Sequence, residues 1–146
     1  VFSGGAFMNR PDNWLDRYIG LPWKIGGREL HGGIDCWGLV RLVMRDEAGI
    51  DMPSWVDDPD AHGETCRSRS RAFDRHLDQF FRVPAGEEQL FDIVAFFIGP
   101  ALWHVGVLVQ LPHTMLHIEG PEGSQCEDWT LRADLKKQFG GFWRVR

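Results

Sequence analysis

The hydrophobic pattern of this chain changes its period once, near Pro84 and Gly86. Before that point, apolar residues recur at intervals of three and four, which is the spacing of one face of a helix. Beyond it, they form short runs rich in Phe, Ile and Val, or they alternate with polar residues, as in strands. Helices followed by strands with short connections are typical of an α+β fold with an antiparallel sheet.

The clearest single element is a helix over residues 36–48. Asp35 is a favourable N-cap, and Gly49 stands where a helix commonly ends, with Pro53 preventing its resumption. One apolar stripe follows the helical spacing: Cys36, Leu39, Val40, Val43 and Met44. Cys36 is therefore expected in the first turn, on the buried face of this helix.

The other expected elements have weaker signals. Further helices are predicted over residues 14–19, between Asn13 and Gly20, and over residues 65–79, with an apolar face of Ala72, Phe73, His76 and Phe80. Loops are predicted at the glycine-rich residues 23–33 and at the acidic residues 52–63. Strands are predicted at residues 91–98, 103–110 and 114–119, with weaker candidates at 126–131 and 139–145.

Composition and charge narrow the class of protein. A chain of 146 residues with 43% hydrophobic residues is expected to form one domain, here residues 8–146. Residues 1–7 precede Met8 and are expected to be a stub, left by cloning or by processing of a precursor. The net charge of −5 argues against a nucleic-acid partner, and no apolar stretch reaches the ~20 residues of a membrane span. Three cysteines are too few for a disulfide framework, although a Cys66–Cys126 pair stays open.

Two histidines are expected to face each other across a hairpin at residues 111–112. If the turn is centred just after Gln110, antiparallel counting places His104 directly opposite His117, with their Cβ atoms ~5 Å apart. Gly106 and Met115 would share this face. The other face would carry Trp103, Val105, Val107 and Val109.

A thiol at a helix N-terminus beside an imidazole is a combination suited to nucleophilic catalysis. The N–H groups and dipole of the helix would stabilise a thiolate at Cys36, and His104 would accept and later return its proton. His117 would hold the ring of His104 in one tautomer. A buried packing role for Cys36 is the alternative. A zinc site built from these three residues competes as well, but Cys36, His104 and His117 are not spaced as in a CxxC, HxxxH or HExxH motif, so no metal or other cofactor is expected.

Several segments resemble the NlpC-type cysteine peptidases, the papain-like cell-wall hydrolases of bacteria and phages. Residues 33–40 (GIDCWGLV) resemble the nucleophile motif, and residues 104–107 (HVGV) resemble the histidine strand. Residues 115–118 (MLHI) fall where the family places its third polar residue. Residues 92–97 (DIVAFF) resemble the strand before the histidine, and residues 23–27 (WKIGG) the stretch before the nucleophile. In order and spacing, the resemblance runs from Leu21 to the end of the chain.

This resemblance implies a papain-like fold, with N-terminal helices packed on a C-terminal antiparallel sheet. It implies Cys36 as nucleophile, His104 as general base and acid, and His117 as the orienting residue. The implied partner is the peptide stem of peptidoglycan, cleaved between D-γ-glutamyl and a diamino acid through a thioester. Residues 36–53 are similar to members found in phage tails, which implies other tail proteins as partners and the virion tail as location. A secreted or periplasmic protein is the alternative, although no signal is visible in this chain.

Two residues depart from the family pattern. Trp23 stands where the family usually has a tyrosine that assists the oxyanion site, and Trp37 replaces the small residue that often follows the nucleophile. With Asp35, they are the secondary candidates for oxyanion or substrate binding. The departures keep open a catalytically silent structural or wall-binding module of the same fold. Acyl transfer, as in permuted relatives whose histidine comes first, is disfavoured because the cysteine comes first here.

Overall fold

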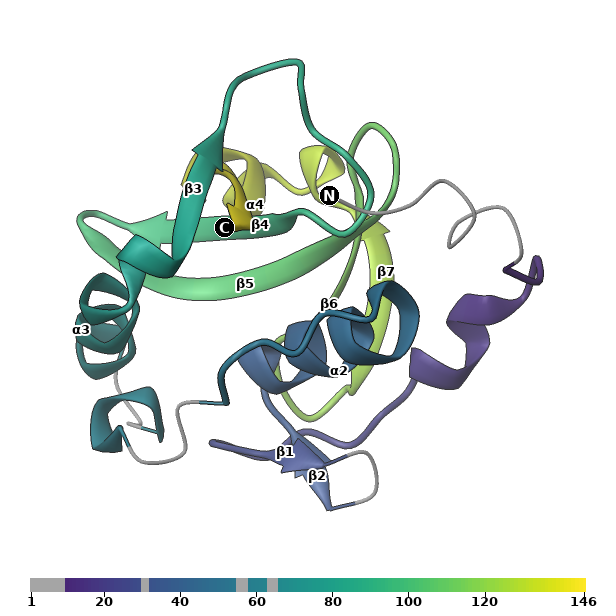
Figure 1. Ribbon diagram of the computed structural model, residues 1–146, viewed down its shortest axis with the longest axis horizontal. Helices are drawn as coiled ribbons and strands as arrows, with labels where there is room; N and C mark the ends of the chain where they lie inside the picture. Colours follow the sequence, from purple (N-terminus) through teal and green to yellow (C-terminus); the bar gives the residue numbers. More distant parts are fainter. Residues whose placement is uncertain (1–9, 30–31, 55–57, 63–65) are drawn as a thin grey trace.

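The computed structural model describes residues 10–29, 32–54, 58–62 and 66–146 of the chain (Figure 1). An antiparallel six-stranded sheet with the order β3-β8-β4-β5-β6-β7 forms its centre. The strands are β3 (Phe80–Val83), β4 (Ile93–Ile98), β5 (Ala101–Gln110), β6 (Thr114–Ile118), β7 (Ser124–Asp128) and β8 (Phe139–Val145). This arrangement confirms the α+β prediction. The stub predicted at residues 1–7 lies outside the described residues.

Helix α2 (Cys36–Ala48) has the predicted limits. The Asp35 side chain accepts a hydrogen bond from the Gly38 N–H at 2.7 Å, which is the N-cap contact that the sequence predicted. At the other end, Gly49 adopts a left-handed conformation with φ of 69°, and the Ile50 N–H donates to the Met44 carbonyl at 3.0 Å. The local sequence therefore determines both ends of the helix.

Helix α2 lies beside strands β5 and β6 (Figure 1), and its apolar stripe packs on them. Leu39, Val40 and Val43 are buried in one cluster with Val105 and Leu116 of the sheet. A second, smaller cluster joins the following residues: Val83, Val94, Phe96, Leu108, Met115, Trp129, Leu135 and Phe142. Since neighbouring residues of β5 and β6 belong to different clusters, the two faces of the sheet are both covered.

The remaining N-terminal elements correct several predicted limits. The first helix is the 3₁₀ turn η1 (Trp14–Tyr18), and Asn13 makes no side-chain cap contact with it. The glycine-rich loop contains a short antiparallel pair, β1 (Arg28–Glu29) and β2 (Gly33–Ile34), while residues 30–31 lie outside the described residues. The acidic loop contains the turn η2 (Pro59–His62), and residues 55–57 and 63–65 are outside the description.

The predicted second helix is divided into α3 (Cys66–Arg75) and the turn η3 (Leu77–Gln79). Phe80, which the sequence assigned to the apolar face of this helix, instead begins β3 and pairs with Val145 of β8. Its ring stacks on Phe73, with centroids 6.3 Å apart. Phe80 therefore contacts α3 from β3. Its apolar contact is the one expected of a longer helix, so the helical spacing gave the wrong element for Phe80.

The C-terminal third confirms the strand predicted at residues 139–145, corrects the limits of the one predicted at 126–131, and adds helical elements between them. The predicted strand at residues 126–131 is β7 followed by the turn η4 (Trp129–Leu131), and α4 (Ala133–Gln138) precedes β8. Cys126 on β7 is a free thiol, so it does not form the disulfide left open with Cys66. Burial raises the pKa of Cys126 to about 11. No helix in the described ranges is both long and apolar enough to cross a membrane.

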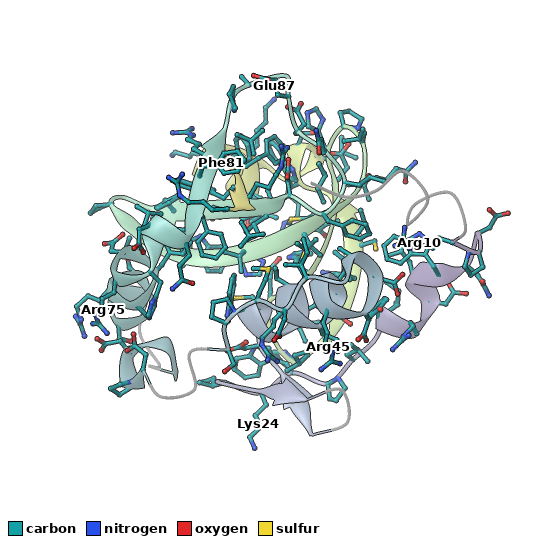
Figure 2. All side chains as sticks on the ribbon, in the orientation of Figure 1. Arg10, Lys24, Arg45, Arg75, Phe81 and Glu87 are labelled. Atoms are coloured by element: carbon teal, nitrogen blue, oxygen red, sulfur yellow. The ribbon has the colours of Figure 1, made fainter. Side chains whose placement is uncertain are left out.

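Two ion pairs connect segments that are distant in sequence. Arg10 lies beside the C-terminal end of α2 (Figure 2), where its Nε contacts Glu47 Oε1 at 2.7 Å. Arg144 of β8 contacts both oxygens of Asp92 at 2.6 and 2.8 Å. Asp92 is fully buried and also accepts a hydrogen bond from the Gln89 N–H. The buried carboxylate is therefore compensated by charge and by hydrogen bonds.

Candidate active site

Cys36 is the first residue of α2 and is half-buried. The start of the helix is held against the turn before β1, because the Asp35 N–H donates to the Gly27 carbonyl at 3.1 Å. Gly38 makes this approach possible: a Cβ added there would lie 2.3 Å from the same Gly27 oxygen and 2.8 Å from Ile34 Cγ1. Glycine at position 38 therefore determines how closely the N-terminus of α2 approaches the β1–β2 unit.

His104 and His117 are brought together as the sequence predicted, but in a different register. Val107 faces Leu116 rather than Thr114, because the turn is centred near Pro112 and a bulge follows Leu108. A shift of two residues leaves side chains on the same face of a sheet. The histidines are consequently diagonal neighbours, and the His104 Nε2 and His117 Nδ1 atoms are 2.8 Å apart.

Both rings are buried, with His104 at 3% and His117 at 0% relative exposure. The ring of His104 lies 5.8 Å from that of Phe96 and 5.0 Å from that of Trp103, measured between centroids. Trp103 was predicted on the opposite face. The β4–β5 ladder passes from Phe96–His104 to Phe97–Leu102, so Trp103 is the extra residue of a bulge and lies beside His104. Strand alternation alone could not reveal this.

A network of charged residues surrounds His117, and the sequence analysis did not identify it. Glu119 Oε1 lies 3.6 Å from His117 Nδ1, and Glu127 Oε1 lies 3.3 Å from His117 Nε2. Arg132 contacts both carboxylates and also binds Asp134 at 2.7 Å. Glu119 follows His117 by two residues, directly after the end of β6, which was the available signal. Glu127 and Arg132 come from later elements whose register the sequence does not show.

Burial lowers the pKa of His117, although Glu127 and Glu119 act in the opposite direction. The neutral form of His117 is therefore favoured. Among the described residues, its Nε2 has no partner with hydrogen-bond geometry, so the Glu127 oxygen at 3.3 Å is an electrostatic neighbour. A proton on His117 Nε2 would point toward this carboxylate and leave Nδ1 as an acceptor for His104. Proton exchange with a nucleophile would then use Nδ1 of His104.

The secondary candidates have different environments. Asp35 is the N-cap of α2, as described above. Trp37 is 7% exposed, donates its indole N–H to the Pro53 carbonyl at 3.0 Å and meets the Phe80 ring edge-on. These contacts show a packing role for Trp37, and its predicted contact with substrate stays a prediction. Trp23 is 38% exposed and its backbone bridges to Ile34, so its assignment to the substrate site stays a prediction.

One group of side chains in the described part of the chain could hold a metal ion. His104, His117 and Glu119 each offer a ligand atom, and these atoms all lie within 4.8 Å of one another. The third ligand in this group is Glu119, whereas the zinc site weighed from the sequence had Cys36. A separate cavity of about 400 Å³ lies between β3, β8 and the loop after β3. None of the predicted catalytic residues lines this cavity. The histidine pair is therefore the better candidate for chemistry.

Comparison with known proteins supports the assignment of the fold. A sequence model of the NlpC/P60 family matches residues 20–138. An NLP/P60 protein similar to a lipoprotein, from Staphylococcus aureus, superimposes with a TM-score of 0.66 at 23% identity, covering 99% of this chain and 42% of that one. The NlpC/p60 domain of the peptidoglycan hydrolase SagA gives a TM-score of 0.52 at 20% identity, covering 90% and 91%.

The chain therefore belongs to the NlpC/P60 family, whose peptidoglycan hydrolases are cysteine peptidases. A curated relative, the gamma-DL-glutamyl hydrolase of Bacillus subtilis (strain 168), is 39% identical over 49 residues. That match covers 34% of this chain and 12% of the relative. The chain thus spans a small part of that relative and less than half of the staphylococcal protein.

Proposed function

We propose that this domain is a cysteine endopeptidase that hydrolyses peptidoglycan stem peptides between a D-γ-glutamyl residue and a diamino acid. The observation that carries the proposal is the 2.8 Å contact between the buried His104 and His117, on two strands that both contact the helix beginning at Cys36. The name of the Bacillus subtilis relative, a gamma-DL-glutamyl hydrolase, supports the choice of a γ-linked bond.

In the proposed reaction, His104 Nδ1 accepts the proton of the Cys36 thiol. The thiolate attacks the peptide carbonyl carbon, and the oxygen becomes an oxyanion. Asp35 already uses the N–H groups of Gly38 and Leu39, so stabilisation falls to earlier N–H groups of α2. The proton on His104 passes to the leaving amine, and water, deprotonated by the same ring, hydrolyses the thioester. His117 keeps His104 in the required tautomer throughout.

For this reaction, the Cys36 thiol and the His104 ring have to come within reach of each other. Val105 and Val107 lie in the cluster that α2 contacts, so that face of β5 is already filled. The thiol and imidazole therefore have to meet at the open end of the β5–β6 ladder, beyond the Val107–Leu116 pair. If they meet there, Cys36 alkylation will depend on the ionisation of His104.

The test uses the tripeptide L-Ala-γ-D-Glu-diaminopimelate and its α-linked isomer, with products separated by chromatography. The domain should cleave the γ-linked peptide, while Cys36→Ala and His104→Ala should lose activity by at least about 10³-fold. Cys126→Ala is the matched control, since it removes another thiol and should retain activity. Cleavage that survives in folded Cys36→Ala would refute the nucleophile, and equal cleavage of both isomers would refute the γ-specificity.

A catalytically silent wall-binding module of the same fold gives a different result. It would retain peptidoglycan in a sedimentation assay but release no peptide, and Cys36 would alkylate no faster than a free thiol. The tail-associated location is a further part of the proposal and rests on the resemblance of residues 36–53 to tail proteins. Detection of this chain in purified virions would support that location, and its absence from them would oppose it.

A further inference from the structure

The pair of histidines and the adjacent carboxylate have the chemistry of a transition-metal site. We propose that His104 Nε2, His117 Nδ1 and a Glu119 oxygen bind a divalent ion of the zinc class, and that the bound ion blocks peptidase turnover. Binding by these three residues stands independently of the peptidase activity. The inhibitory consequence rests on the function proposed above.

Two of the three distances between donor atoms are close to those of a tetrahedral ion, and all three donor atoms lie within 4.8 Å of one another. Zinc binds imidazole nitrogen and carboxylate oxygen at about 2.0–2.2 Å, which places the donor atoms roughly 3.3–3.5 Å apart. In the structure, the two nitrogens are 2.8 Å apart and His117 Nδ1 lies 3.6 Å from Glu119 Oε1. The rings would have to separate by about 0.5 Å. Three protein ligands would leave the fourth position for water.

The surroundings of His117 match those of a metal-bound histidine. Such a histidine usually donates its other ring N–H to a carboxylate, which fixes the tautomer. His117 is fully buried, and its Nε2 lacks a hydrogen-bond partner in the described chain while facing the Glu127 oxygen at 3.3 Å. An ion on Nδ1 would place the proton on Nε2, directed at Glu127. In the metal-bound state, the unpartnered His117 Nε2 would therefore carry the proton and direct it at Glu127.

The local charge also favours a divalent cation. Glu119, Glu127 and Asp134 all contact Arg132, so one guanidinium compensates three carboxylates. Two negative charges remain in this group, which a divalent ion would neutralise. The Glu119 side chain is 26% exposed, so an ion can approach from its side.

The expected consequence for catalysis follows from the atom that the ion occupies. An ion on Nε2 of His104 replaces the hydrogen bond to His117 and leaves the ring proton on Nδ1. A ring in this state cannot accept the proton of a thiol, so the general base is lost. Occupancy and turnover therefore exclude each other. Removing the ion with a chelator should restore the activity.

The experiment titrates Co²⁺ and Zn²⁺ into the Cys36→Ala protein, which removes the Cys36 thiol as a ligand and any dependence on activity. Tetrahedral Co²⁺ absorption should develop at one ion per chain, and Zn²⁺ should displace it. Glu119→Gln should weaken binding at least about 10-fold. Glu127→Gln should weaken it by about 10–100-fold, because it removes the carboxylate that faces His117 Nε2. Glu122→Gln is the matched control, because this nearby carboxylate is exposed and absent from the cluster.

The outcomes separate this proposal from the proposed function. Absence of Co²⁺ binding in folded Cys36→Ala overturns the metal site and leaves the peptidase untouched. Binding that Glu119→Gln and Glu122→Gln reduce equally overturns the ligand set. Binding with the expected pattern supports the site, even if the wild-type chain cleaves no peptide. In an active wild-type enzyme, turnover that continues at saturating Zn²⁺ refutes the inhibition.

Discussion

Replacing Gly38 by alanine should damage the proposed active site without touching any catalytic side chain. Helix propensity alone favours alanine by about 1 kcal/mol. However, its Cβ would lie 2.3 Å from the Gly27 oxygen, 0.7 Å short of the 3.0 Å that real Cβ contacts keep. Overpacking costs about 1–3 kcal/mol, and losing the Asp35–Gly27 hydrogen bond about 1 kcal/mol more. We therefore expect Gly38→Ala to reduce the free energy of unfolding by about 2 kcal/mol.

The effect on activity should be larger than this loss of stability suggests. Relief of the clash moves the first turn of α2, which carries Cys36, away from the β1–β2 turn by a substantial part of an ångström. Displacements of about 1 Å can reduce turnover about 10²-fold. The relevant measurements are urea unfolding, kcat/KM on the γ-linked tripeptide, and the rate of Cys36 alkylation, the last of which does not require turnover.

Gly49→Ala is the matched control, because it lies at the opposite end of the same helix. Its φ of 69° makes alanine unfavourable, but no atom lies within 4 Å of the added Cβ. We expect a loss of about 1–2 kcal/mol in stability with unchanged kcat/KM and unchanged Cys36 alkylation. The reasoning is refuted if Gly38→Ala is more stable than the wild type, or if both variants alkylate at the wild-type rate.

Three further predictions concern ionisable groups. Because burial lowers the pKa of His117, the unfolded chain binds a proton below about pH 6.5 that the native state does not bind. The free energy of unfolding should therefore fall between this pH and the pKa of the folded state, by up to about 1.4 kcal/mol per pH unit. Urea titrations should show a smaller fall in His117→Gln. Arg144→Met should destabilise the fold by about 3–5 kcal/mol, because it leaves the fully buried Asp92 without its charge partner, whereas the exposed Arg75→Met should cost under about 1 kcal/mol in the same urea assay. Cys126, with its pKa raised to about 11, should be alkylated at pH 8 about two orders of magnitude more slowly than a free thiol; peptide mapping by mass spectrometry would contradict this if it found the two rates equal.

The predictable parts of the fold were those that depend on residues close together in the sequence. Helix α2 was predicted to its last residue because the cap at Asp35, the apolar stripe and Gly49 all lie within one short segment. Strands β4, β5 and β6 were found for a similar reason. Strand β3 was missed because Phe80 satisfies a helical period and a strand contact equally well, and only its pairing with Val145 decides between them.

In the candidate site, too, the features that depend on one strand were predictable, and those that depend on pairing between strands were not. The shared face of His104 and His117 was predictable, since any register shift of two residues preserves it. The exact pairing was not, because it depends on a turn centred near Pro112 and on a bulge after Leu108. The bulge that moves Trp103 beside His104 also arises from contacts between strands. Bulges and turn centres belong to the assembled sheet rather than to one segment.

Arg132 adds to the effect of burial in favouring the neutral form of His117. Burial alone keeps His117 neutral, but two carboxylates at 3.3 and 3.6 Å favour its protonated form. Arg132 holds both carboxylates and so weakens their effect on the ring, which preserves His117 Nδ1 as an acceptor for His104. A doubly protonated His117 could neither orient a general base nor bind a metal ion. Arg132 therefore supports both proposed roles through the charge that it places beside Glu119 and Glu127, although no contact described above joins it to His104 or Cys36.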